Sequence, residues 1–122
     1  MRFRIAAAVL AAALLGVAGA AAAAPRVTLT PVGGKAGARI VVRGSGWAQI
    51  EFCKPRVLLA VDDVVFARAL LDGHGRFAVR WRIPVLARGT HRVFATQRCE
   101  SGKDGSPVYR RASDLIRIGS GP

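Results

Sequence analysis

The side chains of this sequence that could do catalytic chemistry are a serine between glycines, two adjacent aspartates and a histidine in a turn. Ser45 stands in Gly-Ser-Gly, but a nucleophile elbow needs G-x-S-x-G between a strand and a helix. Asp62 and Asp63 are neighbours, and neighbouring side chains on a strand point to opposite faces. His74 lies between glycines, where turn formation explains it. We therefore predict that the protein is not an enzyme.

Cys53 and Cys99 are the two cysteines of the chain. No C-x-x-C motif or nearby histidine pair accompanies them, which disfavours a zinc site. An even pair in an exported chain predicts one disulfide, with two free thiols as the alternative that an oxidising compartment makes less favourable. Such a bond would stabilise the fold by roughly 3–4 kcal/mol. We expect no metal and no cofactor.

The first 24 residues differ from the rest of the chain. Met-Arg-Phe-Arg supplies positive charge, an apolar run follows, and alanines precede Pro25. This is the layout of a secretory signal peptide, with cleavage between Ala20 and Ala24. An uncleaved membrane anchor is the alternative, because residues 5–24 are about long enough to span a bilayer. We predict cleavage, export to the periplasm or the extracellular medium, and no stable membrane insertion afterwards.

The remaining chain is strongly basic. The whole sequence carries 19 Lys and Arg against 7 Asp and Glu, and removing Arg2 and Arg4 leaves 17 against 7, a net charge of +10. Such a charge favours anionic partners, among them nucleic acid, acidic polysaccharide and phosphate-rich envelope polymers. The alternative is that the arginines reflect coding bias and form a solvated surface without a defined ligand.

After the leader, short alternating runs separated by Gly, Pro, Asp and Ser predict β-strands. The clearest is 76–83, where Phe77, Val79, Trp81 and Ile83 share one face and arginines the other. Asp62 and Asp63 predict a hairpin turn, 31–37 a glycine-rich turn, and 98–107 a polar loop. The expected strands are 26–30, 38–44, 56–61, 64–71, 76–83, 90–97 and 114–118, and 108–113 would extend the pairing.

These strands predict an all-β fold, a two-sheet antiparallel sandwich of about seven strands. We expect a single domain over residues 25–118, preceded by the signal peptide at 1–24 and followed by a frayed tail at 119–122.

Four short motifs follow one another along the chain: Gly-Ser-Gly-Trp at 44–47, Asp-Gly-His-Gly-Arg-Phe at 72–77, a proline at 84, and Gly-Thr-His-Arg-Val-Phe-Ala at 89–95. This order resembles the immunoglobulin-like domains of the IPT/TIG kind in bacterial exported proteins, which carry a Gly-x-Gly-aromatic step after the second strand. The matching positions are Pro31, Gly44, Gly46, Trp47, Asp72, Gly75, Phe77, Pro84, Gly89, Val93 and Ala95.

The glycines of the first motif have a predicted backbone role. Gly44 and Gly46 would let the chain leave its strand through conformations closed to residues with a side chain. Trp47 would then plug the end of the sandwich, the alternative being an exposed platform for a sugar or peptide. Trp81 is expected in the core.

The sequence departs from the resemblance at His91, where such domains often have a tyrosine that pins a loop. We expect the same structural role for His91, with a ligand or pH-sensing role as the alternative. The cysteine pair is the second departure, and the topology implies that it ties loops at one end of the sandwich. A weaker likeness exists to the enediyne-binding apoproteins of the neocarzinostatin kind, which have disulfide-tied loops over a ligand cleft.

Two candidate surfaces follow. A binding or adhesion module would use the disulfide-tied end, at Gln49, Glu51, Lys54, Lys103 and Asp104, to contact a protein or an envelope polymer. A binder of anionic polymers would instead use a stripe formed by Arg76, Arg80 and Arg82, with Arg39 and Arg43 adjoining if the strands pair suitably. A small-molecule carrier is the third interpretation and would need a pocket. Neither the partner nor the oligomeric state follows from the sequence.

Overall fold

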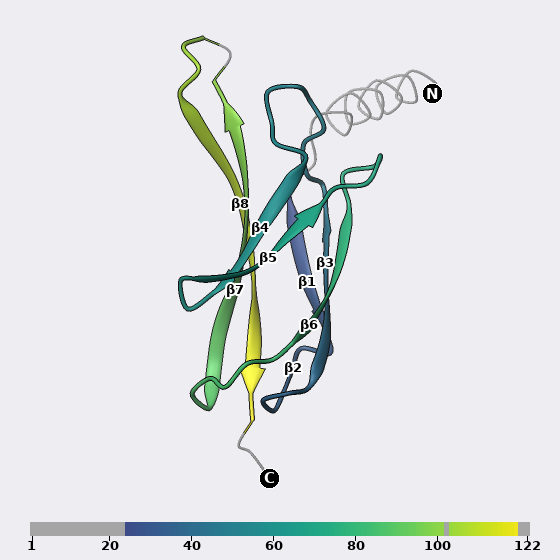
Figure 1. Cartoon of the computed structure of the whole chain (residues 1–122), viewed down its shortest axis with the longest axis vertical. Helices are drawn as coiled ribbons and strands as arrows, with labels where there is room; N and C mark the ends of the chain where they lie inside the picture. The colour runs from purple at the N-terminus through teal and green to yellow at the C-terminus, as the bar shows by residue number, and fades with distance from the viewer. Residues whose placement is uncertain (1–23, 102, 120–122) are drawn as a thin grey trace, which may run out of the picture.

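A computed structural model describes residues 24–101 and 103–119, and it contains strands and turns but no helix there (Figure 1). None of these residues therefore forms a helix that could cross a membrane. The predicted signal peptide at 1–24 lies outside the described residues except for Ala24, and so do residues 120–122 of the predicted tail. The all-β fold class is confirmed.

Eight strands form two sheets that face each other across one core. The three-stranded sheet has the order β1-β3-β6 and consists of β1 (Arg26–Thr30), β3 (Arg39–Ser45) and β6 (Phe77–Arg82). The five-stranded sheet has the order β2-β8-β7-β4-β5 and consists of β2 (Gly33–Gly34), β4 (Arg56–Val61), β5 (Val64–Leu70), β7 (Gly89–Glu100) and β8 (Pro107–Ile118).

Two predictions about the strands were wrong. The segment 98–107 was expected to be a loop; instead β7 and β8 are 12-residue strands of one long hairpin, and β8 includes 108–113, which was expected to extend the pairing. Buried and exposed side chains continue to alternate in β7 through Gln97 and Cys99. The residues around them are polar, and for this reason the sequence resembles a loop. The predicted turn at 31–37 also contains β2, which pairs with β8 in parallel, so the sandwich is not purely antiparallel.

The core consists of side chains from alternate positions on the inner faces of both sheets. Val42 from the three-stranded sheet and Val57, Leu59, Val93 and Ile116 from the five-stranded sheet are completely buried. Removing apolar surface from water is the main favourable term in folding, at roughly 25 cal/mol per Å². The outward positions between these residues remain free to carry charge.

Trp47 plugs the end of the sandwich and is not an exposed platform. It is buried, its backbone N–H donates to the Gly75 carbonyl, and its ring lies 6.3 Å from that of Phe77. Gly46 has the left-handed backbone (φ 74°) that was predicted. The prediction for Gly44 was wrong: its φ is not left-handed, and it is needed because the Phe77 ring occupies the space of a Cβ.

The β4–β5 hairpin was predicted with its turn, and both Asp62 and Asp63 have positive φ, as a two-residue primed turn requires. A β-bulge follows in β5, where the pairing skips Phe66. Phe66 stacks on Trp81 of the opposite sheet with 4.0 Å between ring centroids. This pair closes one side of the sandwich and confirms that Trp81 is a core residue.

The loop from β3 to β4 crosses between the sheets and is anchored on β7. Gln97 is completely buried, and its amide donates to the carbonyls of Ala48 and Lys54 at 2.8 and 2.9 Å. The Gln97 carbonyl oxygen accepts from the Ala48 N–H at 3.0 Å. One side chain thus satisfies three backbone groups that no strand can pair.

The predicted disulfide joins Cys53 of the same loop to Cys99. Cys99 was expected to open a loop but lies in β7, so the bond ties a loop to a strand. It does not bridge the two sheets, because both β7 and the neighbouring β4 belong to the five-stranded sheet.

Replacing Gln97 by Leu should destabilise the protein strongly, because three backbone groups of Ala48 and Lys54 would lose their partner. We expect the free energy of unfolding to fall by about 3 kcal/mol, measured by urea denaturation. Thr96→Ala, on the outward face of the same strand, is the matched control and should cost less than about 1 kcal/mol. Equal stability of Gln97→Leu and the parent protein would contradict the anchoring role.

The Cys53–Cys99 bond closes a long loop, since the two residues are 46 positions apart. The double variant Cys53→Ala/Cys99→Ala should lose about 4 kcal/mol of unfolding free energy in the chain-entropy model. Reduction of the parent protein should lower its stability to that of the variant in the same denaturation experiment. Identical midpoints for oxidised and reduced protein would contradict this prediction.

Candidate functional site

The outward side of the three-stranded sheet is a surface of arginines, which we call the arginine face. Its strands place apolar residues inward and have arginines among their outward residues, and β1, β3 and β6 contain no Asp or Glu. The arginines predicted from the β6 pattern and those of the neighbouring strands lie on this one side. The arginine face consists of Arg26, Arg39, Arg43, Arg76, Arg80 and Arg82.

The strand register brings these arginines together. The two arginines of β3 therefore adjoin those of β6, which the sequence analysis left open. Arg39 lies directly opposite Arg82, and Arg80 is opposite Val41, between Arg39 and Arg43 on the facing strand. Opposed side chains on one sheet face have Cβ atoms about 5 Å apart, and like charges so placed destabilise the fold. The arginine face therefore carries a repulsion that a bound anion would relieve.

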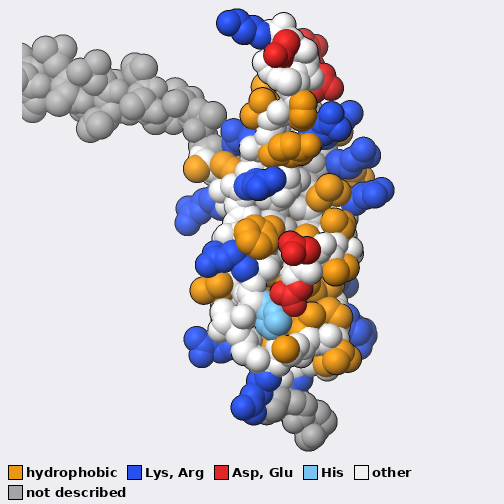
Figure 2. Space-filling view, turned by 90° about the vertical axis from the view of Figure 1, so that its left-hand side faces the viewer, with side chains coloured by type: hydrophobic (Ala, Val, Ile, Leu, Met, Phe, Trp, Pro, Cys, Tyr) orange, Lys and Arg blue, Asp and Glu red, His pale blue; other side chains and the backbone are white. Residues whose placement is uncertain are grey.

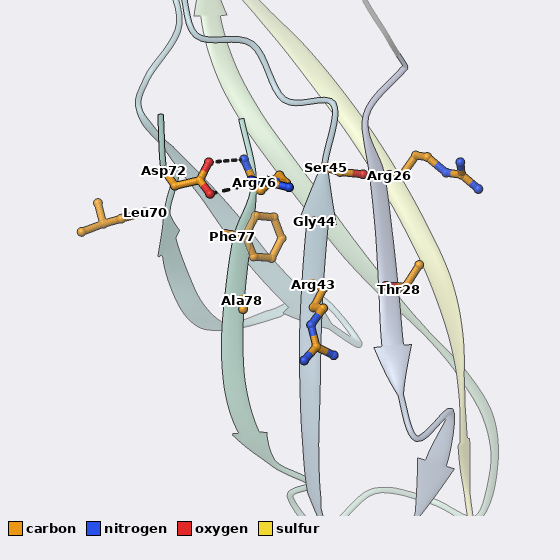
Figure 3. Close-up of a pocket in the computed structure, with 10 residues that line it drawn as sticks. All are labelled: Arg26, Thr28, Arg43, Gly44, Ser45, Leu70, Asp72, Arg76, Phe77 and Ala78. Atoms are coloured by element: carbon orange, nitrogen blue, oxygen red, sulfur yellow. Dashed lines mark hydrogen bonds and ion pairs between the residues drawn. The ribbon is translucent and has the colours of Figure 1, made fainter. Parts of the chain in front are cut away.

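A hollow of about 600 Å³ lies at one end of the arginine face (Figure 3). Figure 3 shows Arg26 and Arg43 extending from neighbouring strands, with the Phe77 ring against Gly44. The hydroxyl-bearing Thr28 and Ser45 also line it, as do Leu70, Asp72, Arg76 and Ala78. Guanidinium groups beside hydroxyl groups form a set of donors suited to phosphate, sulfate or carboxylate oxygens.

Asp72 is the one acidic residue at this hollow, and it serves the turn before β6. Its carboxylate accepts the backbone N–H groups of His74 and Arg76 at 2.7 and 3.0 Å. The hydrogen bonds from Arg76 and then His74 lower the pKa of Asp72, so it stays ionised. The Arg76 side chain lies 3.6 Å from the same carboxylate, which positions its guanidinium at the rim.

The residues predicted at the disulfide-tied end do not form one cluster. The Gln49 side-chain amide donates to the Asp72 carbonyl and so links the β3–β4 loop to the β5–β6 turn. Glu51 is exposed on that loop, and the backbone N–H of Lys54 donates to Arg98. Lys103 and Asp104 lie elsewhere, in the turn that joins β7 to β8 at the tip of the projecting hairpin (Figure 1).

The β3–β4 loop also presents apolar side chains that the sequence analysis did not select. Ile50 and Phe52 are 58% and 50% exposed next to Cys53. Their loop is held by the disulfide and by Gln97, so these side chains are displayed on a rigid support.

His91 fastens two connections at the other end of the molecule. Its Nδ1 lies 3.0 Å from an Asp62 carboxylate oxygen, and its Nε2 contacts the Ala87 carbonyl at 2.6 Å. Both partners only accept hydrogen bonds, so the doubly protonated ring satisfies both. The Asp62 hydrogen bond, followed by that of Ala87, raises the pKa of His91.

Sequence reasoning missed Arg26 and a second basic surface on the five-stranded sheet. Arg26 stands at the start of β1, where only the pairing with β3 shows its neighbours. Figure 2 shows Lys and Arg side chains along both margins of the molecule, whereas acidic side chains gather near its middle and upper end. The arginine excess is thus distributed over two sides.

Within residues 24–101 and 103–119, no group of three or more His, Cys, Asp or Glu side chains could hold a metal ion. Neither a protein-family model nor a curated protein sequence matches the chain. Any function therefore has to be argued from the surfaces described above.

The His91 contacts predict a specific dependence of stability on pH. A raised pKa means that this contribution is fully present below the ordinary value of 6.5 and is lost as pH rises through the higher folded value. The difference in unfolding free energy between the parent protein and His91→Gln should therefore shrink above pH 6.5. Urea denaturation across this range measures it, and a difference that grows with pH would contradict the assignment.

Proposed function

We propose that the protein is an exported, non-catalytic binding module that holds an anionic polymer on its arginine face. The observation that supports this most directly is the Arg39–Arg82 register, which places like charges opposite each other on strands without any acid. A solvated surface produced by coding bias has no need of this alignment. An extended anion would neutralise several of these charges at once and release its own counterions.

The spread of the arginines over three strands favours a polymer over a compact ligand. Strands lie about 4.8 Å apart and successive outward residues about 6.7 Å apart, so the arginines are separated by one or more such steps across three strands. Arg26 and Arg82 mark opposite ends of it on different strands. A chain with repeating charges can contact several arginines at once, which a single small anion cannot do.

We further propose that the sandwich is immunoglobulin-like, as the IPT/TIG resemblance implies. The strand orders support this: β3 lies between β1 and β6, and β7 lies between β4 and β8. An immunoglobulin sandwich has the same neighbours, with strand B between A and E and strand F between C and G. The Cys53–Cys99 disulfide supports export, because disulfides persist in oxidising compartments.

A second candidate function is contact with a protein through the disulfide-tied loop. The exposed Ile50 and Phe52 on their rigid support favour it, since aromatic and apolar anchors dominate protein interfaces. This contact would depend on apolar burial and would resist salt, unlike binding by the arginine face.

The arginine face should capture anionic polymers in a salt-dependent way. Purified oxidised protein should bind heparin and single-stranded DNA but not neutral dextran. The triple variant Arg39→Gln/Arg43→Gln/Arg80→Gln should weaken binding and reduce the slope of log affinity against log salt by about 2 for DNA. Within the described part of the chain, these three side chains make no hydrogen bond or ion pair, so the fold should persist.

The matched control removes the same charge outside the arginine face, as Arg88→Gln/Arg92→Gln/Arg117→Gln. Equal losses in both triple variants would show that net charge alone drives capture and would contradict the proposal. Discrete proteins that remain bound at high salt, and are lost in Ile50→Ser/Phe52→Ser, would favour the second candidate function instead.

A further inference from the structure

A separate basic cleft lies on the outward side of the five-stranded sheet. It has a volume of about 340 Å³, within the range of small-ligand sites. Residues of four neighbouring strands, or residues next to those strands, line it, so the sheet forms its base. It is lined by Lys54, Arg56, Leu58, Arg68, Thr96, Arg98 and Tyr109.

The strand register explains how the cations meet. Leu58 pairs with Arg68 on one side and with Thr96 on the other. Arg56 precedes Leu58 by two residues on β4 and Arg98 follows Thr96 by two on β7, so both arginines lie beside this pair on the outward side of adjacent strands. The sheet therefore holds like charges on adjacent strands, which costs stability unless an anion lies between them.

No acidic side chain lines this cleft among the described residues. The two ion pairs found in that part of the chain, Arg76–Asp72 and His91–Asp62, are elsewhere. Three arginines and one lysine thus line the cleft without a counter-charge from the described residues. A ligand with a single negative charge would leave most of this charge uncompensated, whereas a doubly charged group compensates more of it.

Tyr109 forms an aromatic wall of the cleft. It pairs with Arg98 across β7 and β8 and is 49% exposed. The guanidinium of Arg111 lies 5.7 Å from the centre of its ring, a cation–π contact that helps to orient it. The exposed part of the ring can pack against the body of a ligand, and its hydroxyl can donate to an oxygen.

We propose that this cleft is a second binding site, specific for a phosphate monoester carried on a sugar or aromatic ring. The phosphate would lie between Arg56 and Arg98, which can each donate two hydrogen bonds to its oxygens. The ring would pack against Tyr109. A phosphate monoester carries nearly two negative charges at pH 7, which compensates about half of the positive charge of the cleft. The proposal does not rest on the proposed function of the arginine face, because the two surfaces belong to different sheets.

The test is a titration of the oxidised protein, followed by NMR through the side-chain signals of arginines and Tyr109. The probes are inorganic phosphate, phenyl phosphate and glucose 6-phosphate, with phenol and glucose as neutral controls. We expect saturable shifts of Arg56, Arg98 and Tyr109 with both organic phosphates, weaker binding of inorganic phosphate, and none with the neutral controls. Tighter binding of the glucose or the phenyl compound identifies which kind of ring the cleft prefers.

Three variants separate the parts of the cleft. Arg56→Gln and Arg98→Gln should each weaken binding of phenyl phosphate about tenfold, since each removes charged hydrogen bonds. Tyr109→Leu should weaken the organic phosphates but leave inorganic phosphate unchanged, which a merely structural role would not do. Arg88→Gln/Arg117→Gln, which lies in neither basic site, is the control and should bind all three probes as the parent protein does.

Shifts spread equally over the arginines of both sheets, or an absence of saturation with every probe, would overturn the proposal. Equal affinity for inorganic and organic phosphates would overturn the role of Tyr109 and with it the ring specificity. Polymer capture by the arginine face is measured independently with its own triple variant. A failure of either site is therefore visible without the other.

Discussion

The anchoring of the β3–β4 loop on strand β7 is the interaction on which the rest of the structure depends. A loop that crosses between sheets leaves backbone groups that no strand can pair, and Gln97 supplies their partners while Cys99 adds a covalent tie. With the loop fixed, Trp47 can close the core. The same loop reaches the β5–β6 turn through Gln49, whose partner Asp72 orients Arg76. The anchor thus extends from the buried core to the edge of the arginine face.

Much of the architecture was predictable because it is determined by a local alternation of side chains. Residues 56–61 form the predicted strand without any change of bounds, and β1 likewise matches 26–30. The Asp62–Asp63 turn and the buried face of β6 followed from the same rules, since turn residues and period-two patterns act over a few positions. The disulfide followed from the even number of cysteines in a chain that was predicted to be exported.

What could not be predicted depends on contacts between distant segments. Gln97 is polar, and nothing around it in sequence shows that it is buried against a loop more than forty residues away. The adjacency of Arg39 and Arg82 depends on strand register, which the alternation of either strand leaves open. The cleft around Tyr109 combines residues from β4, β5, β7 and β8, and each of them alone resembles an ordinary exposed side chain.

Two basic surfaces on opposite sides of one small sandwich impose an energetic problem that the fold has to offset. Like charges aligned on both sheets repel each other and favour unfolding, and a domain of this size has only one core to oppose them. The completely buried Gln97 side chain and the disulfide add stability that does not depend on these surface charges. They stabilise the five-stranded sheet at the strand β7 that also carries Arg98 of the cleft. The Gln97 hydrogen bonds and the disulfide therefore help a sandwich this small to remain folded while both of its outer faces are cationic.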